Sequence, residues 1–156
     1  MKVQCWYLPA AEPGREFCFY LGLREELNAK EQVMLRWLLS FVPGQSLSAK
    51  SMFRETAVVE VGPRLNFETP FSSNAVSIFR GCGIEKIVRC EIATRYPVPK
   101  GADPASYAEG LFDRMTQMVY TQPLESFAVT GESEPVYRVP ILAEGREALV
   151  RESKKM

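Results

Sequence analysis

The chain has 156 residues, of which 46% are hydrophobic and 24% charged, and this length and composition predict one globular domain rather than a disordered segment. It contains no histidine, which excludes a Ser-His-Asp triad, a Cys-His nucleophile pair and a His-ligated zinc site. Nineteen Lys and Arg residues balance nineteen Asp and Glu residues, and this zero net charge argues against a nucleic-acid partner, which requires clustered basic side chains.

The cysteines and the N-terminal residues indicate the cellular compartment. No two of the four cysteines have C-x-x-C spacing, so we expect no metal site in this chain. The first residues lack the basic and apolar regions of a signal peptide, and no apolar run approaches the roughly 20 residues that span a bilayer. We therefore expect a cytoplasmic protein with reduced thiols and no membrane partner.

The N-terminal third is expected to contain two strands and a helix. Bulky apolar residues predict strands over 3–8 and 16–23. Asn28 and Glu31 have the spacing of a capping box, and apolar residues at helical spacing follow them. This pattern predicts a helix over 28–41.

A strand, a connection and a second helix are expected next. A β-branched run predicts a strand over 56–61, and two prolines make 63–70 an extended connection. Ser72 and Ser73 are residues that often cap helices. They precede one helical face formed by Ala75, Ile78, Phe79 and Cys82.

The last part of the chain continues the alternation of strands and helices. A strand is predicted over 85–97, and Asp103 before Pro104 predicts the start of a third helix. The apolar stripe of that helix would be Tyr107, Leu111, Met115, Met118 and Val119. A polar break at 130–134, a short strand over 136–141 and a charged helix over 143–155 complete the prediction. The fold class expected is α+β, an antiparallel sheet with helices packed on one side.

The connection between residues 60 and 74 is the strongest candidate site. It concentrates polar residues in a segment that two prolines stiffen and that leads to a helix N-terminus, where an anion is favoured. The functional interpretation is an anion-binding or domain-docking loop, and the alternative is an ordinary strand-to-helix connection with a serine cap and a surface arginine. The candidate residues are Arg64, Asn66, Thr69, Ser72, Ser73 and Asn74.

Asp113 and Arg114 form a second candidate. Sequence neighbours on a helix do not face each other, so at least one of these charges is expected to have a partner elsewhere, as in a domain-docking contact. The alternative is two ordinary surface charges.

Several segments resemble phosphoribosylformylglycinamidine synthase, the large single-chain, glutamine-dependent ligase of purine biosynthesis. The most specific segments are Val61-Gly62-Pro63-Arg64, Asn66-Phe67 and the run from Thr69 to Ser77. Other similar segments follow the same order, and the resemblance covers nearly the whole chain. They are 34–39, 89–96, Leu111-Phe-Asp-Arg-Met115 and Gly145-Arg-Glu-Ala-Leu149.

The resemblance implies that this chain corresponds to an N-terminal domain similar to a dimer of the small PurS-type subunit. That domain would span 1–142, and the helix over 143–156 would lead toward a linker domain absent from this chain. The resemblance further implies that the glutaminase residues and the ATP and magnesium ligands belong to later domains, so no catalytic residue, cofactor or metal is expected here. The domain would contact the synthase and glutaminase domains and the substrate formylglycinamide ribonucleotide (FGAR).

Three interpretations remain open at this point. The chain is a non-catalytic coupling domain of the ligase, with an exposed docking patch that the other domains cover. Alternatively, it is a stand-alone accessory protein that bridges separate synthase and glutaminase subunits. In the third interpretation it is an independent domain that holds a phosphate at the Ser72-Ser73 helix start. The reading frame beyond Met156 would discriminate the first two, and calorimetric titration with the ribonucleotide would test the third.

Overall fold

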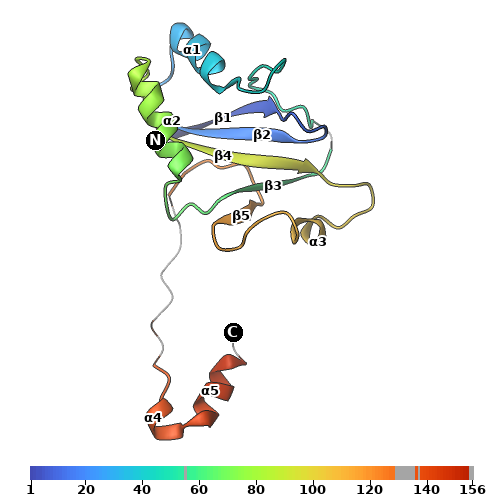
Figure 1. The fold of residues 1–156 in the computed structure, drawn as a ribbon, viewed down its shortest axis with the longest axis vertical. Helices are drawn as coiled ribbons and strands as arrows, with labels where there is room; N and C mark the ends of the chain where they lie inside the picture. Colours follow the sequence, from blue (N-terminus) through green and yellow to red (C-terminus); the bar gives the residue numbers. More distant parts are fainter. Residues whose placement is uncertain (55, 129–135, 137, 155–156) are drawn as a thin grey trace.

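An antiparallel sheet forms the centre of the computed structural model, which describes residues 1–54, 56–128, 136 and 138–154 (Figure 1). Within these residues the sheet has five strands in the order β1-β2-β4-β3-β5, and every neighbouring pair is antiparallel. The strands are β1 Lys2–Pro9, β2 Glu16–Leu23, β3 Val58–Pro63, β4 Ile87–Pro97 and β5 Gln117–Tyr120. The helices are α1 Ala29–Leu39, α2 Pro70–Gly81, α3 Pro104–Ala108, α4 Ile141–Glu144 and α5 Arg146–Ser153.

The helices α1, α2 and α3 cover one face of the sheet, which confirms the predicted α+β class. Alternate residues of each strand point to this face, where Phe19 of β2 packs with Leu35 of α1 and Phe79 of α2. The register places Val61 of β3 on the same face, and there it clusters with Ala108 of α3.

A second cluster lies on the opposite face of the sheet. Tyr20 of β2, Ala93 of β4 and Tyr120 of β5 are buried there, together with Phe127. The cover on this side is thus the segment around 124–127, which follows β5, rather than a helix.

Most of the elements predicted in the first hundred residues are confirmed. The strands over 3–8, 16–23 and 85–97 form, and α1 begins after Asn28 with both hydrogen bonds of the capping box. The third strand lies two residues later than predicted. The second helix begins earlier than predicted, because Thr69 rather than Ser72 or Ser73 is the N-cap and Pro70 occupies the first turn.

The prediction of a long third helix is wrong. Asp103 does cap α3, but α3 ends at Ala108, and 117–120 form β5 rather than a helical stripe. Beyond the end of α3, Asp113 forms a turn in which its carboxylate accepts hydrogen bonds from the Met115 amide at 2.8 Å and from the Thr116 hydroxyl at 3.1 Å. Pairing of β5 with β3 buries Tyr120. Because this pairing joins residues far apart in the chain, the local spacing of apolar residues could not predict it.

The C-terminal prediction is also corrected. Residues 136 and 138–140 are irregular rather than a strand, and Ile141 begins α4. The single helix over 143–155 is replaced by α4 and α5, which are interrupted at Gly145, whose φ of 56° favours glycine. The polar break at 130–134 and residues 137, 155 and 156 lie outside the described residues. No described helix is long and apolar enough to cross a membrane.

Candidate functional site

Thr69 has a structural role at the start of α2. Its hydroxyl oxygen accepts a hydrogen bond from the Ser72 amide at 3.1 Å and donates one to the Glu91 carboxylate of β4 at 2.6 Å. Glu91 is fully buried, and Arg89 forms an ion pair with it at 2.9 Å. The N-terminus of α2 is therefore already next to a carboxylate of this chain, in the position expected for a bound anion.

Ser72 likewise has a structural role. Its side chain is buried, its hydroxyl donates to Glu68 at 2.9 Å, and its oxygen accepts from the Cys90 amide at 3.1 Å. These contacts tie the first turn of α2 to β4. Together with those of Thr69, they favour a cap for the helix start rather than an open phosphate site.

The remaining candidates in this connection are exposed. Ser73 donates to the Thr69 carbonyl at 3.3 Å, while the side chains of Asn66 and Asn74 have no hydrogen-bond partner among the described residues. Ser73 also lines a shallow hollow of about 310 Å³ beside α2, together with Glu68, Val76, Ser77, Arg80 and Val88. These three polar side chains are available for contact with another surface.

Arg64 joins the two groups of candidate residues. Its guanidinium donates two hydrogen bonds to the Arg114 carbonyl, at 3.0 and 2.7 Å, and its amide donates to the Thr116 carbonyl. Asp113 is used within the same turn, as described above. The Arg114 guanidinium has no ion-pair or hydrogen-bond partner within the described part of the chain. Unlike the side chains of Arg64 and Asp113, it is therefore available for contact with another surface.

A buried polar network on the face opposite the helices was not predicted from the sequence. Arg95 lies between Glu16, at 2.9 Å, and Glu60, at 3.1 Å, and the Tyr20 hydroxyl donates to Glu60. Burial raises the pKa of Glu60, and the contacts with Tyr20 and Arg95 oppose that rise. The signal in the sequence was a charged residue inside a β-branched run, Val59-Glu60-Val61.

Every member of this network bonds within the chain, so the arrangement rigidifies the sheet rather than presenting a reactive group. The described residues contain no group of three or more His, Cys, Asp or Glu side chains that could hold a metal ion.

Comparison with known proteins identifies the family. Residues 16–128 match the family model described as formylglycinamide ribonucleotide amidotransferase N-terminal. Among curated proteins, phosphoribosylformylglycinamidine synthase of Dictyostelium discoideum is 36% identical, and that of Homo sapiens is 32% identical. A probable chloroplastic/mitochondrial synthase of Arabidopsis thaliana is 35% identical.

Each of these alignments covers 90% of this chain but only 11 to 12% of the relative. The region they share with this chain includes the connection with Arg64 and Thr69, the start of α2 and the strand β4. The chain belongs to the formylglycinamide ribonucleotide amidotransferase N-terminal family.

Proposed function

We propose that this chain works as the N-terminal domain of a glutamine-dependent phosphoribosylformylglycinamidine synthase. That ligase converts FGAR, glutamine and ATP into the amidine product (FGAM), glutamate, ADP and phosphate. The observation that carries the proposal is the family match over 16–128, supported by long relatives that bear this name. Because the matched relatives are far longer than this chain, the same observation favours a domain of the ligase over a stand-alone accessory protein.

The proposed contribution of this domain is a contact surface for the synthase and glutaminase domains and for FGAR. The exposed side chains of Asn66, Ser73 and Asn74 support it, as does the link from Arg64 to the turn with the free Arg114 guanidinium. Thr69 and Ser72 would hold that surface in shape through Glu91 and Glu68. We place ATP and magnesium in the remainder of the ligase and assign them no residue of this chain.

A cytoplasmic location is part of the same proposal. It is supported by the four cysteines Cys5, Cys18, Cys82 and Cys90, none of which forms a disulfide bond within the described residues. The name of the Arabidopsis relative places that protein in organelles, so fractionation of cells that express the tagged protein is the appropriate test.

The proposed contact surface is tested with Arg64→Ala and Ser73→Ala in the full-length enzyme. Either variant is expected to raise the KM for FGAR or to lower the amount of product formed per glutamine hydrolysed. Arg24→Ala is the matched control, because Arg24 is an exposed arginine whose side chain has no partner among the described residues. Unchanged KM and unchanged coupling in both variants, with the fold intact by circular dichroism, would contradict the proposed role.

A further inference from the structure

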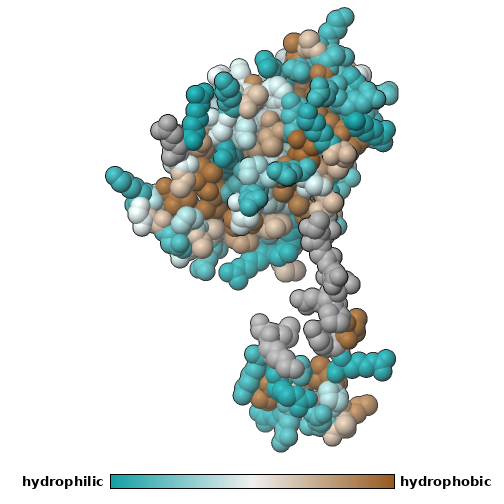
Figure 2. Space-filling model, turned by 180° about the vertical axis from the view of Figure 1, so that it is seen from behind, coloured by the Kyte–Doolittle hydropathy of each residue, from teal (hydrophilic) through white to brown (hydrophobic). Residues whose placement is uncertain are grey.

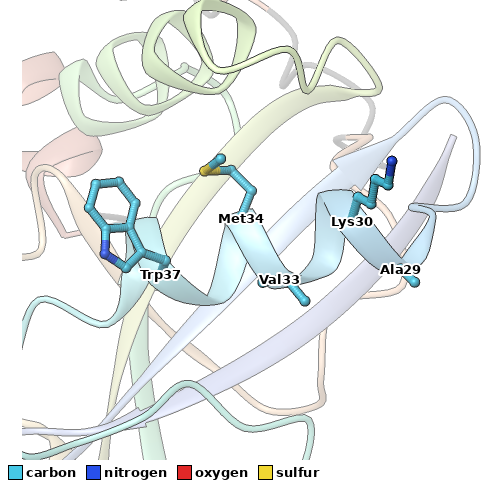
Figure 3. Close-up of a pocket in the computed structure, with 5 residues that line it drawn as sticks. All are labelled: Ala29, Lys30, Val33, Met34 and Trp37. Atoms are coloured by element: carbon cyan, nitrogen blue, oxygen red, sulfur yellow. The ribbon is translucent and has the colours of Figure 1, made fainter.

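The outward side of α1 is apolar. Trp37 is 74% exposed, Val33 68% and Met34 39%. With Ala29 and Lys30 these side chains line an open hollow of about 640 Å³, and Figure 3 shows them along one stretch of the helix. We define these five residues as the α1 surface.

The inward side of α1 is apolar as well. Leu35 and Leu39 are buried there against the sheet. A helix at the surface of a globular protein normally has one apolar side and one polar side, and a helix that is apolar on both sides is normally covered on both. The composition of α1 is therefore that of a helix between two layers, whereas the residues that the structure describes supply only one of them.

The exposed apolar side chains of the α1 surface are adjacent to one another on one helix. Single apolar side chains exposed at a protein surface are common, and Figure 2 shows groups of brown apolar side chains bordered by polar ones on the back of the molecule. The α1 surface instead places Val33 and Trp37 four residues apart on one helical ridge, with the small Ala29 leaving a depression beside them. Lys30 is the one charged residue of the α1 surface, and within the described residues it has no ion-pair partner.

The size of the α1 surface decides what can occupy it. A helix of 11 residues is about 16 Å long. One side of it cannot supply the roughly 800 Å² that each partner buries in a stable complex between separate proteins. A tethered partner does not need that area, because the linkage gives it an effective concentration of about millimolar. The matched region covers only 11 to 12% of the relatives' length, so in those proteins this domain is covalently linked to much further polypeptide.

We propose that the α1 surface is an intramolecular docking site and that its occupant is an apolar surface of the longer polypeptide, with an acidic side chain against Lys30. This inference rests on the proposed function, since it requires that longer polypeptide. Trp37 would fill a recess in the occupant, and the depression at Ala29 would accept a side chain from it.

The test is maleimide labelling of the Val33→Cys variant in two proteins, the 156-residue chain and the full-length ligase that contains it. Val33 is exposed, so the substitution is compatible with folding. Peptide mass spectrometry separates this cysteine from the exposed native Cys82, and labelling of each protein in urea provides its reference rate. We expect labelling at least about tenfold slower in the full-length protein than in the 156-residue chain.

Equal labelling rates in the two proteins, with the full-length enzyme forming product, would overturn the docking site and leave the proposed function intact. Labelling of the 156-residue chain that slows as its concentration rises would assign the α1 surface to a second copy and overturn the intramolecular occupant. Protection of Val33→Cys in a full-length protein that forms no FGAM would support docking while refuting the proposed function.

Discussion

Glu60 is the buried carboxyl whose ionisation opposes folding. It lies in β3 between two buried valines, and burial raises its pKa above the ordinary value of 4.5 despite the nearby Arg95 and the hydrogen bond from Tyr20. Glu31, at the start of α1, shows the reverse effect. The Asn28 amide and the Lys86 ammonium lower the pKa of its carboxyl. The two residues thus contribute to the pH dependence of stability with opposite signs.

The Glu60→Gln substitution makes this contribution measurable. As the pH rises from 4.5 to the raised pKa of Glu60, the unfolded chain loses a proton that the folded chain retains, so the wild type loses stability. The glutamine cannot ionise, so we expect the stability of the variant relative to the wild type to increase over this interval. Urea unfolding at a series of pH values from about 3 to 7 measures the difference.

Glu31→Gln is the matched control, because glutamine can keep the capping box. Its sign is reversed: the advantage of the wild type over this variant should be present above 4.5 and be lost as the pH falls through the lowered pKa of Glu31. Two variants whose relative stabilities change in the same direction with pH would contradict this account of the buried network.

The elements show which features a local pattern can predict. The capping box at Asn28 and Glu31 acts within four residues, so the sequence was sufficient to place the start of α1. At the start of α2 three residues, Thr69, Ser72 and Ser73, are of types that cap helices. Pro70 favours the first helical turn, so its position indicates Thr69 as the N-cap. The partner that holds Thr69 is Glu91, which is 22 residues away and was not predicted from local spacing.

The strand β5 shows the limit of periodicity. Leu111, Met115 and Val119 fit a helical stripe, yet Met115 is exposed and Val119 pairs opposite Val61 of β3. In the sequence, nothing but the charge of Asp113 marked the turn that it forms. The edge of β3 with which β5 pairs exists only in the assembled sheet, so a local pattern could not predict the pairing. The same limit applies to the candidate site. The polar loop was recognised in the sequence, but the hydrogen bond from Arg64 to the Arg114 carbonyl joins residues 50 positions apart and was not predicted.

Thr69→Ala should destabilise the isolated chain by about 2 to 3 kcal/mol, because it removes the cap of α2 and one hydrogen bond to a buried carboxylate. Thr69→Ser keeps the hydroxyl and should recover most of that loss in urea unfolding. Asn74→Ala, an exposed change in the same helix, should stay within about 0.5 kcal/mol of the wild type. If Thr69→Ser were as unstable as Thr69→Ala, the hydrogen bonds would not be the source of the effect.

At the scale of the whole molecule, the buried apolar residues of the sheet and its covering layers lie between Trp6 and Phe127. Phe127 closes the second core cluster and lies under the Arg89 guanidinium, 4.7 Å from the ring centre. In Figure 1 α4 and α5 lie apart from the sheet, and an ion pair of 2.7 Å between Glu144 and Arg151 links them to each other. The core clusters of the described residues therefore end at Phe127, and the domain boundary at residue 142 remains a prediction.

Two truncations locate that boundary. A chain ending at Ala128 keeps all three core clusters, so we expect it to unfold in one transition with the urea midpoint of the 156-residue chain. A chain ending at Pro123 loses Leu124 and Phe127 and should be less stable by about 3 to 5 kcal/mol, the range for removing a buried phenylalanine ring. Phe127→Ala in the 156-residue chain is the matched control and should lose a similar amount. A 1–128 chain as unstable as the 1–123 chain would instead show that residues nearer 142 complete the domain.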